Sequence, residues 1–104
     1  MYVIIWAYQV KAEQLVAFEQ IYASNGAWAE LFRKEEGYLG TELLRDSNRP
    51  QRYITIDRWL SSEDYESFRL QRKSEYARLD AQCEGLTEQE TLLGRWESIL
   101  PKTR

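Results

Sequence analysis

Histidine is absent from this sequence of 104 residues, and its absence excludes more chemistry than any other compositional feature. A chain without histidine has no Ser-His-Asp or Cys-His catalytic site and no histidine-ligated zinc, iron or haem. Cys83 is the only cysteine, so an internal disulfide and a cysteine cage for a metal are also excluded, and we expect this thiol to lie in the core. Acid–base catalysis therefore has to come from Asp, Glu, Tyr, Lys or Arg, or from the substrate itself.

The sequence also lacks a concentration of charge of one sign. Its 14 basic and 17 acidic residues are interspersed, so there is no basic patch of the kind that nucleic acid or anionic lipid requires. The N-terminus has no basic leader, and the apolar run of residues 2–10 is too short to cross a bilayer. We expect a single cytoplasmic domain spanning residues 1–104 that binds neither nucleic acid nor a membrane.

Four stretches have the composition of β-strands. Residues 2–10 are apolar at both odd and even positions, which is typical of a strand covered on both faces. Residues 37–59 predict a hairpin, because a turn signal at residues 46–50 separates two stretches of strand-like composition, the second rich in β-branched and aromatic residues. The last strand is predicted at residues 91–100, after a polar loop at residues 87–90.

Two helical regions alternate with these strands. Residues 12–23 and 27–35 form the first, interrupted at Ser24-Asn25-Gly26 by residues that disfavour a helix interior. The second begins after the capping residue Ser61, is expected to bend near Lys73 and ends at Gly85.

The resulting order, β-α-β-β-α-β, predicts an α+β ferredoxin-like fold with a four-stranded antiparallel sheet and both helical regions on one face. Two helical regions cover only one face, yet the first strand is apolar on both. We therefore expect a homodimer in which the open faces of two sheets meet.

The order of aromatic and glycine positions carries a resemblance over nearly the whole chain. It is found in YVIIWAYQVKAEQLVAFE, GAWAELFRKEEGYLGTELLRD, RYITIDRWLSSEDYESF and LLGRWES. In these stretches the sequence resembles the antibiotic biosynthesis monooxygenase family of the dimeric α/β-barrel superfamily. The resemblance implies two sheets forming a shared barrel, and a pocket in each subunit between the helices and the sheet.

The resemblance also bears on the chemistry. Several family members oxidise polycyclic phenols with molecular oxygen and no metal or flavin, so no cofactor is expected. Haem-degrading relatives use a Trp that closes the third strand, a position that Trp59 matches, but they also use an Asn where Trp6 stands and a His on the second helix. The sequence therefore departs from the haem-degrading pattern.

Aromatic residues are the first candidates for a binding site. A cage that suits a flat conjugated substrate is expected from residues of the first strand and the helices, with the alternative that the same rings only fill the core. The candidate substrate-binding residues are Trp6, Trp28, Phe32, Tyr53, Phe68 and Tyr76.

The candidate catalytic residues are Trp59, Asp57 and Tyr8. Asp57 lies among apolar neighbours, so it is interpreted as a base with a raised pKa or as the partner of Arg58 or Arg95 in an ion pair. Three functions stay open: a cofactor-independent monooxygenase acting on a hydroquinone- or anthrone-like compound, a small isomerase or hydrolytic enzyme using Asp57 with Tyr53, and a non-catalytic binding or dimerisation module.

Overall fold

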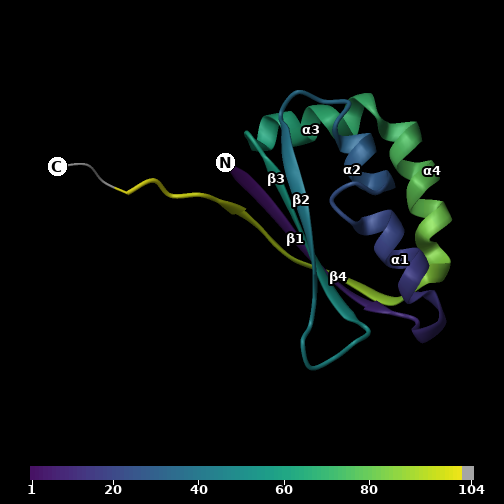
Figure 1. Ribbon diagram of the computed structural model, residues 1–104. Coiled ribbons are helices and arrows are strands. Elements are labelled where there is room, and N and C mark those ends of the chain that lie inside the picture. The colour runs from purple at the N-terminus through teal and green to yellow at the C-terminus, as the bar shows by residue number, and fades with distance from the viewer. Residues whose placement is uncertain (102–104) are drawn as a thin grey trace.

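The computed structural model describes residues 1–101 and has the α+β ferredoxin-like architecture that the sequence predicts (Figure 1). Its four strands form one antiparallel sheet in the order β2-β3-β1-β4, so the first and third strands are central. The elements, in chain order, are β1 (Tyr2–Val10), η1 (Ala12–Gln14), α1 (Leu15–Tyr22), α2 (Ala27–Phe32), β2 (Tyr38–Arg45), β3 (Arg52–Trp59), α3 (Ser62–Gln71), α4 (Lys73–Cys83), η2 (Glu84–Leu86) and β4 (Thr87–Glu97).

The helices lie on one face of the sheet and leave the other face bare (Figure 1). Tyr2, Ile4, Tyr8 and Val10 of β1 point to the helix side and are buried. Their neighbours at odd positions of β1 are half-buried, because no described element covers them. The core therefore lies between the helices and the sheet, and Cys83 is buried in it, as expected.

Both helical regions are broken, and each break has a local cause. A Cβ on Gly26 would lie only 2.3 Å from the backbone oxygen of Ile21, so the close turn between α1 and α2 requires glycine. The break predicted near Lys73 is confirmed, because α3 ends at Gln71 and α4 begins at Lys73. The predicted cap is also confirmed, since the Asp64 backbone N–H donates to Ser61 Oγ at 3.1 Å.

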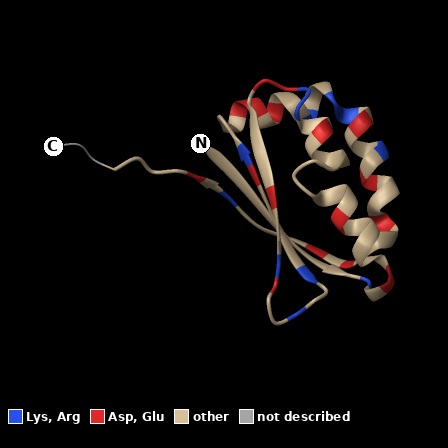
Figure 2. Ribbon diagram, viewed as in Figure 1, with Lys and Arg blue, Asp and Glu red and all other residues tan. Residues whose placement is uncertain are grey.

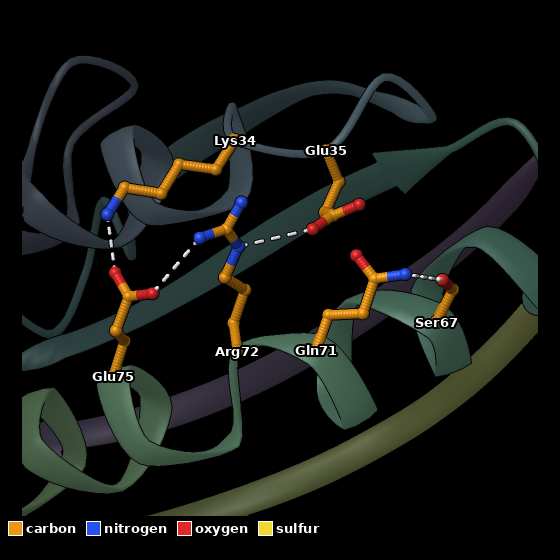
Figure 3. Close-up of polar contacts among 6 residues, drawn as sticks. All are labelled: Lys34, Glu35, Ser67, Gln71, Arg72 and Glu75. Carbon is orange, nitrogen blue, oxygen red and sulfur yellow. Dashed lines mark hydrogen bonds and ion pairs between the residues drawn. The ribbon is translucent and has the colours of Figure 1, made fainter.

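Arg72, which lies at the second break, ties α4 to the segment that follows α2 (Figure 3). Its guanidinium donates to Glu35 Oε1 and to Glu75 Oε1, each at 3.2 Å. Lys34 pairs with the same Glu75 carboxylate. Such exposed pairs contribute about 0–1 kcal/mol each, so they orient α4 more than they stabilise the fold.

A β-bulge near the start of β2 determines which side chains face the helices. The register of β2 against β3 shifts between Tyr38 and Gly40, which leaves Leu39 as an extra, exposed residue. Gly40 has φ of 145°, a conformation that a side chain would strain. The bulge places Tyr38 on the same face as Thr41, three residues later.

The boundaries of some predicted elements are wrong. Residues 87–90 belong to β4 and not to a loop, because Gln89 and Glu90 pair with β1, and the strand ends at Glu97 and not at residue 100. The first helical region opens with a 3-10 turn, and α2 ends at Phe32, three residues before its predicted end. Gly85 does not end a helix but lies within η2.

Among the helices of residues 1–101, none has the length and apolar composition needed to span a bilayer.

Candidate functional site

A cavity of about 180 Å³ lies between the helices and the middle of the sheet, partly open to solvent. A cavity of about 150 Å³ holds a benzene ring, so this one has room for one ring or two small fused rings. Its lining comes from all four strands and from α1, α2 and α4, and consists of Trp6, Tyr8, Tyr22, Trp28, Phe32, Thr41, Thr55, Asp57, Tyr76, Asp80 and Glu90.

Asp57 of β3 lies at the buried end of the cavity, with only 8% of the residue exposed. Thr41 on the adjacent strand donates a hydrogen bond of 2.6 Å to Asp57 Oδ1. The proton of Thr41 is used in this bond, so the Tyr38 hydroxyl, 2.6 Å away, donates to Thr41 Oγ1. Burial raises the pKa of Asp57 to about 6, while the Thr41 hydrogen bond acts in the opposite direction. The carboxyl group therefore changes charge near neutral pH, as a proton acceptor must.

Tyr8 of β1 supplies a neutral hydroxyl beside Asp57. Its oxygen lies 3.1 Å from Thr55 Oγ1 on the neighbouring strand. Burial is the main cause that raises the pKa of Tyr8 far above its ordinary value, so the phenol keeps its proton at any physiological pH. Tyr8 can donate to an oxygen atom of a bound molecule but cannot act as the base.

The walls are aromatic. Trp28 and Phe32 lie one turn apart on α2, with ring centroids 5.9 Å apart. The ring of Tyr76 of α4 lies edge-on to Trp28, with centroids 5.0 Å apart. Tyr22, the last residue of α1, packs edge-on against Tyr8 at 5.1 Å. The break between α1 and α2 therefore lies at the cavity wall, since residues on either side of it line the site.

Two acidic residues lie at the exposed end of the cavity. Asp80 is one helical turn after Tyr76 on α4, and Glu90 of β4 is opposite Tyr8 of β1. Both are exposed, unlike Asp57 at the other end. Burial, followed by the nearby charge of Asp80, raises the pKa of Glu90. The mouth of the cavity is thus acidic.

The structure brings together six of the nine residues that the sequence suggested for the site. The six that line the cavity are Trp6, Tyr8, Trp28, Phe32, Asp57 and Tyr76. The other three lie in packed regions of the core. Trp59 and Phe68 are 0% exposed and pack on the far side of Phe32, with ring centroids 5.6 and 5.2 Å from it. Tyr53 lies under Phe18 and donates a hydrogen bond of 2.5 Å to Glu19.

Neither ion pair considered for Asp57 forms among the described residues. Arg58 points away from it and pairs with Glu42 at 2.5 Å. Arg95 pairs with Glu66 at 3.6 Å. The interpretation of Asp57 as half of a strand ion pair is therefore wrong. Within residues 1–101, the Thr41 hydroxyl is the only hydrogen-bond partner of its carboxyl group.

Five lining residues were missed by sequence reasoning: Tyr22, Thr41, Thr55, Asp80 and Glu90. Thr55 was within reach, because it lies two residues before Asp57 on the same strand face. Thr41 was harder to find, since it depends on the register between β2 and β3. The sequence predicts a loop at residues 87–90, which includes Glu90, and no sequence pattern indicates that Asp80 belongs to a site.

The carboxylates that line the cavity are not arranged as the ligands of a metal ion in the described part of the chain. In the part of the chain that the structure describes, no group of three or more His, Cys, Asp or Glu side chains has the arrangement needed to hold a metal ion.

Similar proteins place this fold among known structures. A point mutant of SnoaB, a cofactor-independent oxygenase from Streptomyces nogalater, superimposes with a TM-score of 0.78 at 17% identity, covering 97% of both chains. A putative antibiotic biosynthesis monooxygenase from Nitrosomonas europaea gives 0.74 at 17% identity, covering 96% of this chain and 100% of that one. Another, from Bordetella bronchiseptica, gives 0.69 at 24% identity, covering 95% and 97%. At identities this low, the structural similarity shows a shared fold and does not show a shared function.

No curated protein matches the sequence at a significant level. The model of one protein family does match it, over residues 1–77, which include the first three strands and reach into α4. This match covers well over half of the chain, and the residues concerned include nine of the eleven that line the cavity. It agrees with the β-α-β-β-α-β order and with the solved structures above. The chain therefore belongs to the antibiotic biosynthesis monooxygenase family.

Proposed function

We propose that this protein is a cofactor-independent monooxygenase that oxidises a small aromatic compound of the hydroquinone or anthrone type with molecular oxygen. The observation that carries the proposal is Asp57, a carboxyl group at the buried end of an aromatic cavity whose pKa lies near 6. Family membership and the distant structural similarity to a cofactor-independent oxygenase support it.

Asp57 is the proposed base. With the substrate between the aromatic walls, its ionised carboxylate removes the acidic proton, which is a ring-bound C–H in an anthrone or an O–H in a hydroquinone. Tyr8 donates a hydrogen bond to the substrate oxygen on which negative charge develops. Thr41 and Tyr38 hold the carboxylate in place through their hydrogen bonds.

Oxygen reacts with the resulting anion. The substrate carbanion passes one electron to O₂, and the radical pair combines to form a carbon–oxygen bond and a peroxide anion. After protonation, an anthrone-type hydroperoxide loses water, so that one oxygen atom remains as a new carbonyl and the other leaves in H₂O. The aromatic lining keeps bulk water away from the radical pair.

The proposed contacts follow from the positions of the side chains. Trp6, Trp28, Phe32 and Tyr76 would hold the substrate ring, because they line the cavity. Trp59, Phe68 and Tyr53 would act only through the walls that they support, since they lie outside it. The alternative pairing of Asp57 with Tyr53 in an isomerase has no geometric support, because Tyr53 is not among the lining residues.

Oxygen uptake and product analysis test the proposal. Purified protein is mixed with hydroquinone or 1,4-dihydroxynaphthalene, which have one and two rings, and the oxygen consumed above the uncatalysed background is recorded. We expect Asp57→Asn to lower the catalysed rate about 10²-fold or more, as loss of a general base does. Thr55→Ser, which keeps the hydroxyl in the same cavity, serves as the control. Uptake that is no faster than background for every such compound, or an Asp57→Asn variant of full activity, would overturn it.

We also propose that two copies of the chain pair through the bare sheet face. That face carries apolar side chains, including half-buried Ile5 and Ile56 on the central strands and Trp96, which is 54% exposed. Membership of a family that is typically dimeric supports this assembly. Light scattering should give a dimer for the wild type and a monomer for Ile56→Lys. Leu70→Lys, at an 80% exposed position of α3, should remain dimeric.

A further inference from the structure

The lining of the cavity has an excess of negative charge, and two of its carboxyl groups, those of Asp80 and Glu90, have no role in the chemistry proposed above. Three carboxyl groups line it, those of Asp57, Asp80 and Glu90, and no Lys or Arg of residues 1–101 does. Within residues 1–101, every ion pair involves other acidic residues. In Figure 2 basic segments gather where α3 meets α4, α4 carries segments of both signs, and most charged segments of β4 are acidic.

Asp80 and Glu90 repel each other at the mouth. Both face the same opening from different elements, α4 and β4, and neither is neutralised by a basic partner among the described residues. Burial is the main cause that raises the pKa of Glu90, and the repulsion from Asp80 adds to it. A cation placed between the two carboxylates would remove the repulsion, whereas an anion would add to it.

The aromatic walls favour the same charge. The faces of Trp and Tyr rings attract cations, by about 0.5–2 kcal/mol depending on exposure. One cation already uses a wall residue, because the Arg69 guanidinium lies 3.9 Å from the centroid of the Tyr76 ring. Arg69 is held by a hydrogen bond to the Tyr65 hydroxyl and does not line the cavity, so it leaves the mouth without a positive charge.

Deeper in the cavity, one buried polar atom lacks a partner. Asp57 is only 8% exposed, and among residues 1–101 no donor reaches its second oxygen, Oδ2. A hydroxyl group of a ligand satisfies this need, since it donates to a carboxylate.

We propose that the ligand of this cavity is a phenol or hydroquinone that carries a protonated amine on a short side chain. Its hydroxyl group lies at the inner end with Asp57, its ring lies between the aromatic walls, and its ammonium group lies at the mouth with Asp80 and Glu90. The proposal deepens the function proposed above, on which it rests for the use of this cavity as the substrate site.

Three probes of matched shape test the charge preference by calorimetric titration at low salt. They are tyramine, 4-ethylphenol and 3-(4-hydroxyphenyl)propionate, which are cationic, neutral and anionic. We expect tyramine to bind at least about tenfold more tightly than 4-ethylphenol, and the propionate to bind most weakly. Equal binding of tyramine and 4-ethylphenol would overturn the proposal.

Charge-neutral variants locate the preference. In the double variant Asp80→Asn with Glu90→Gln, tyramine should bind about as tightly as 4-ethylphenol. The affinity for 4-ethylphenol itself should stay the same, because it has no ammonium group to lose a partner. Glu88→Gln, which removes one acidic charge from the same strand outside the cavity, should keep the full preference and so controls for the net charge. A preference that persists in the double variant would refute the assignment of these two carboxylates.

These titrations separate the inference from the proposed oxygenase function. Binding does not depend on oxygen, so a charge preference without oxygen uptake would leave the ligand class standing and remove the monooxygenase. Oxygen uptake with 1,4-dihydroxynaphthalene but no charge preference would do the reverse.

Discussion

One end of the helix-covered sheet face differs from its middle, although both are rich in aromatic side chains. At the end, Trp59 is fully buried among Phe32, Tyr38, Tyr65 and Phe68, with ring centroids 5.3–5.6 Å away. At the middle, Trp6 borders a cavity. The rings around Trp59 pack against one another. Around Trp6, small and polar residues lie between the rings, and a cavity remains.

This difference teaches that the side chains next to an aromatic residue decide whether it forms a core or a site. Trp6 pairs across the sheet with Thr55, whereas Trp59 pairs with Tyr2 and Tyr38. A threonine is too small to fill the space above a sheet that a tyrosine fills. The cavity is therefore built by the short residues of the central strands as much as by the large ones.

The largest effect on the free energy of unfolding should come from single substitutions of Trp59 and Trp6 by alanine. Trp59→Ala removes a fully packed side chain and should cost about 3–5 kcal/mol of the free energy of unfolding. Trp6→Ala enlarges an existing cavity and should cost less, about 1–2 kcal/mol, while abolishing ligand binding. Urea unfolding measures both losses. If Trp59→Ala does not fold, Trp59→Phe should give a smaller loss of stability in the same direction. Equal losses of stability for the Trp6 and Trp59 variants would contradict the difference between the packed end and the cavity.

The pH dependence of stability should report the buried carboxyl group of Asp57. Its pKa is about 6 in the folded protein and 3.8 ordinarily, so its contribution to stability is fully present below about pH 4 and is lost as the pH rises through 6. Asp57→Asn, which retains an acceptor for Thr41, has no such loss. The variant should equal the wild type near pH 4 and exceed it by roughly 2–3 kcal/mol at pH 8.

Urea unfolding at pH values from 4 to 8 tests this expectation. A difference between Asp57→Asn and the wild type that stays constant over the range would mean that Asp57 titrates normally. The role of Asp57 as a base would then lose its electrostatic support.

The smallest effect concerns Thr41, whose hydrogen bond favours the ionised form of Asp57. Thr41→Val removes the donor, so the pKa of Asp57 should rise further, and the midpoint of the pH–rate profile should move upward by roughly one pH unit. Thr41→Ser keeps the hydroxyl and should leave the midpoint unchanged. A downward shift for the valine variant would contradict the described direction of the bond.

Much of the fold could be predicted from residues alone, because it depends on patterns within single elements. The double-sided apolarity of residues 2–10 gave a central strand, and Ser61 with Asp64 gave a helix start. Part of the site could also be predicted, since Asp57 is a charged residue inside an apolar strand. Trp6 and Trp59 could not be told apart, because which part of a sheet face stays hollow depends on where α2 and α4 cross it.

The bulge in β2 makes the position of Leu39 one where the strand can gain or lose a residue. Side chains alternate along a strand, so a residue gained or lost in a regular segment turns every residue beyond it to the opposite face. At the bulge the extra Leu39 is absorbed without such a reversal, and Tyr38 still reaches Thr41. Deleting Leu39 would restore an ordinary two-residue spacing between Tyr38 and Thr41 and keep both on the helix side. This point is therefore where β2 can change length and leave the hydrogen bonds to Asp57 on the correct face.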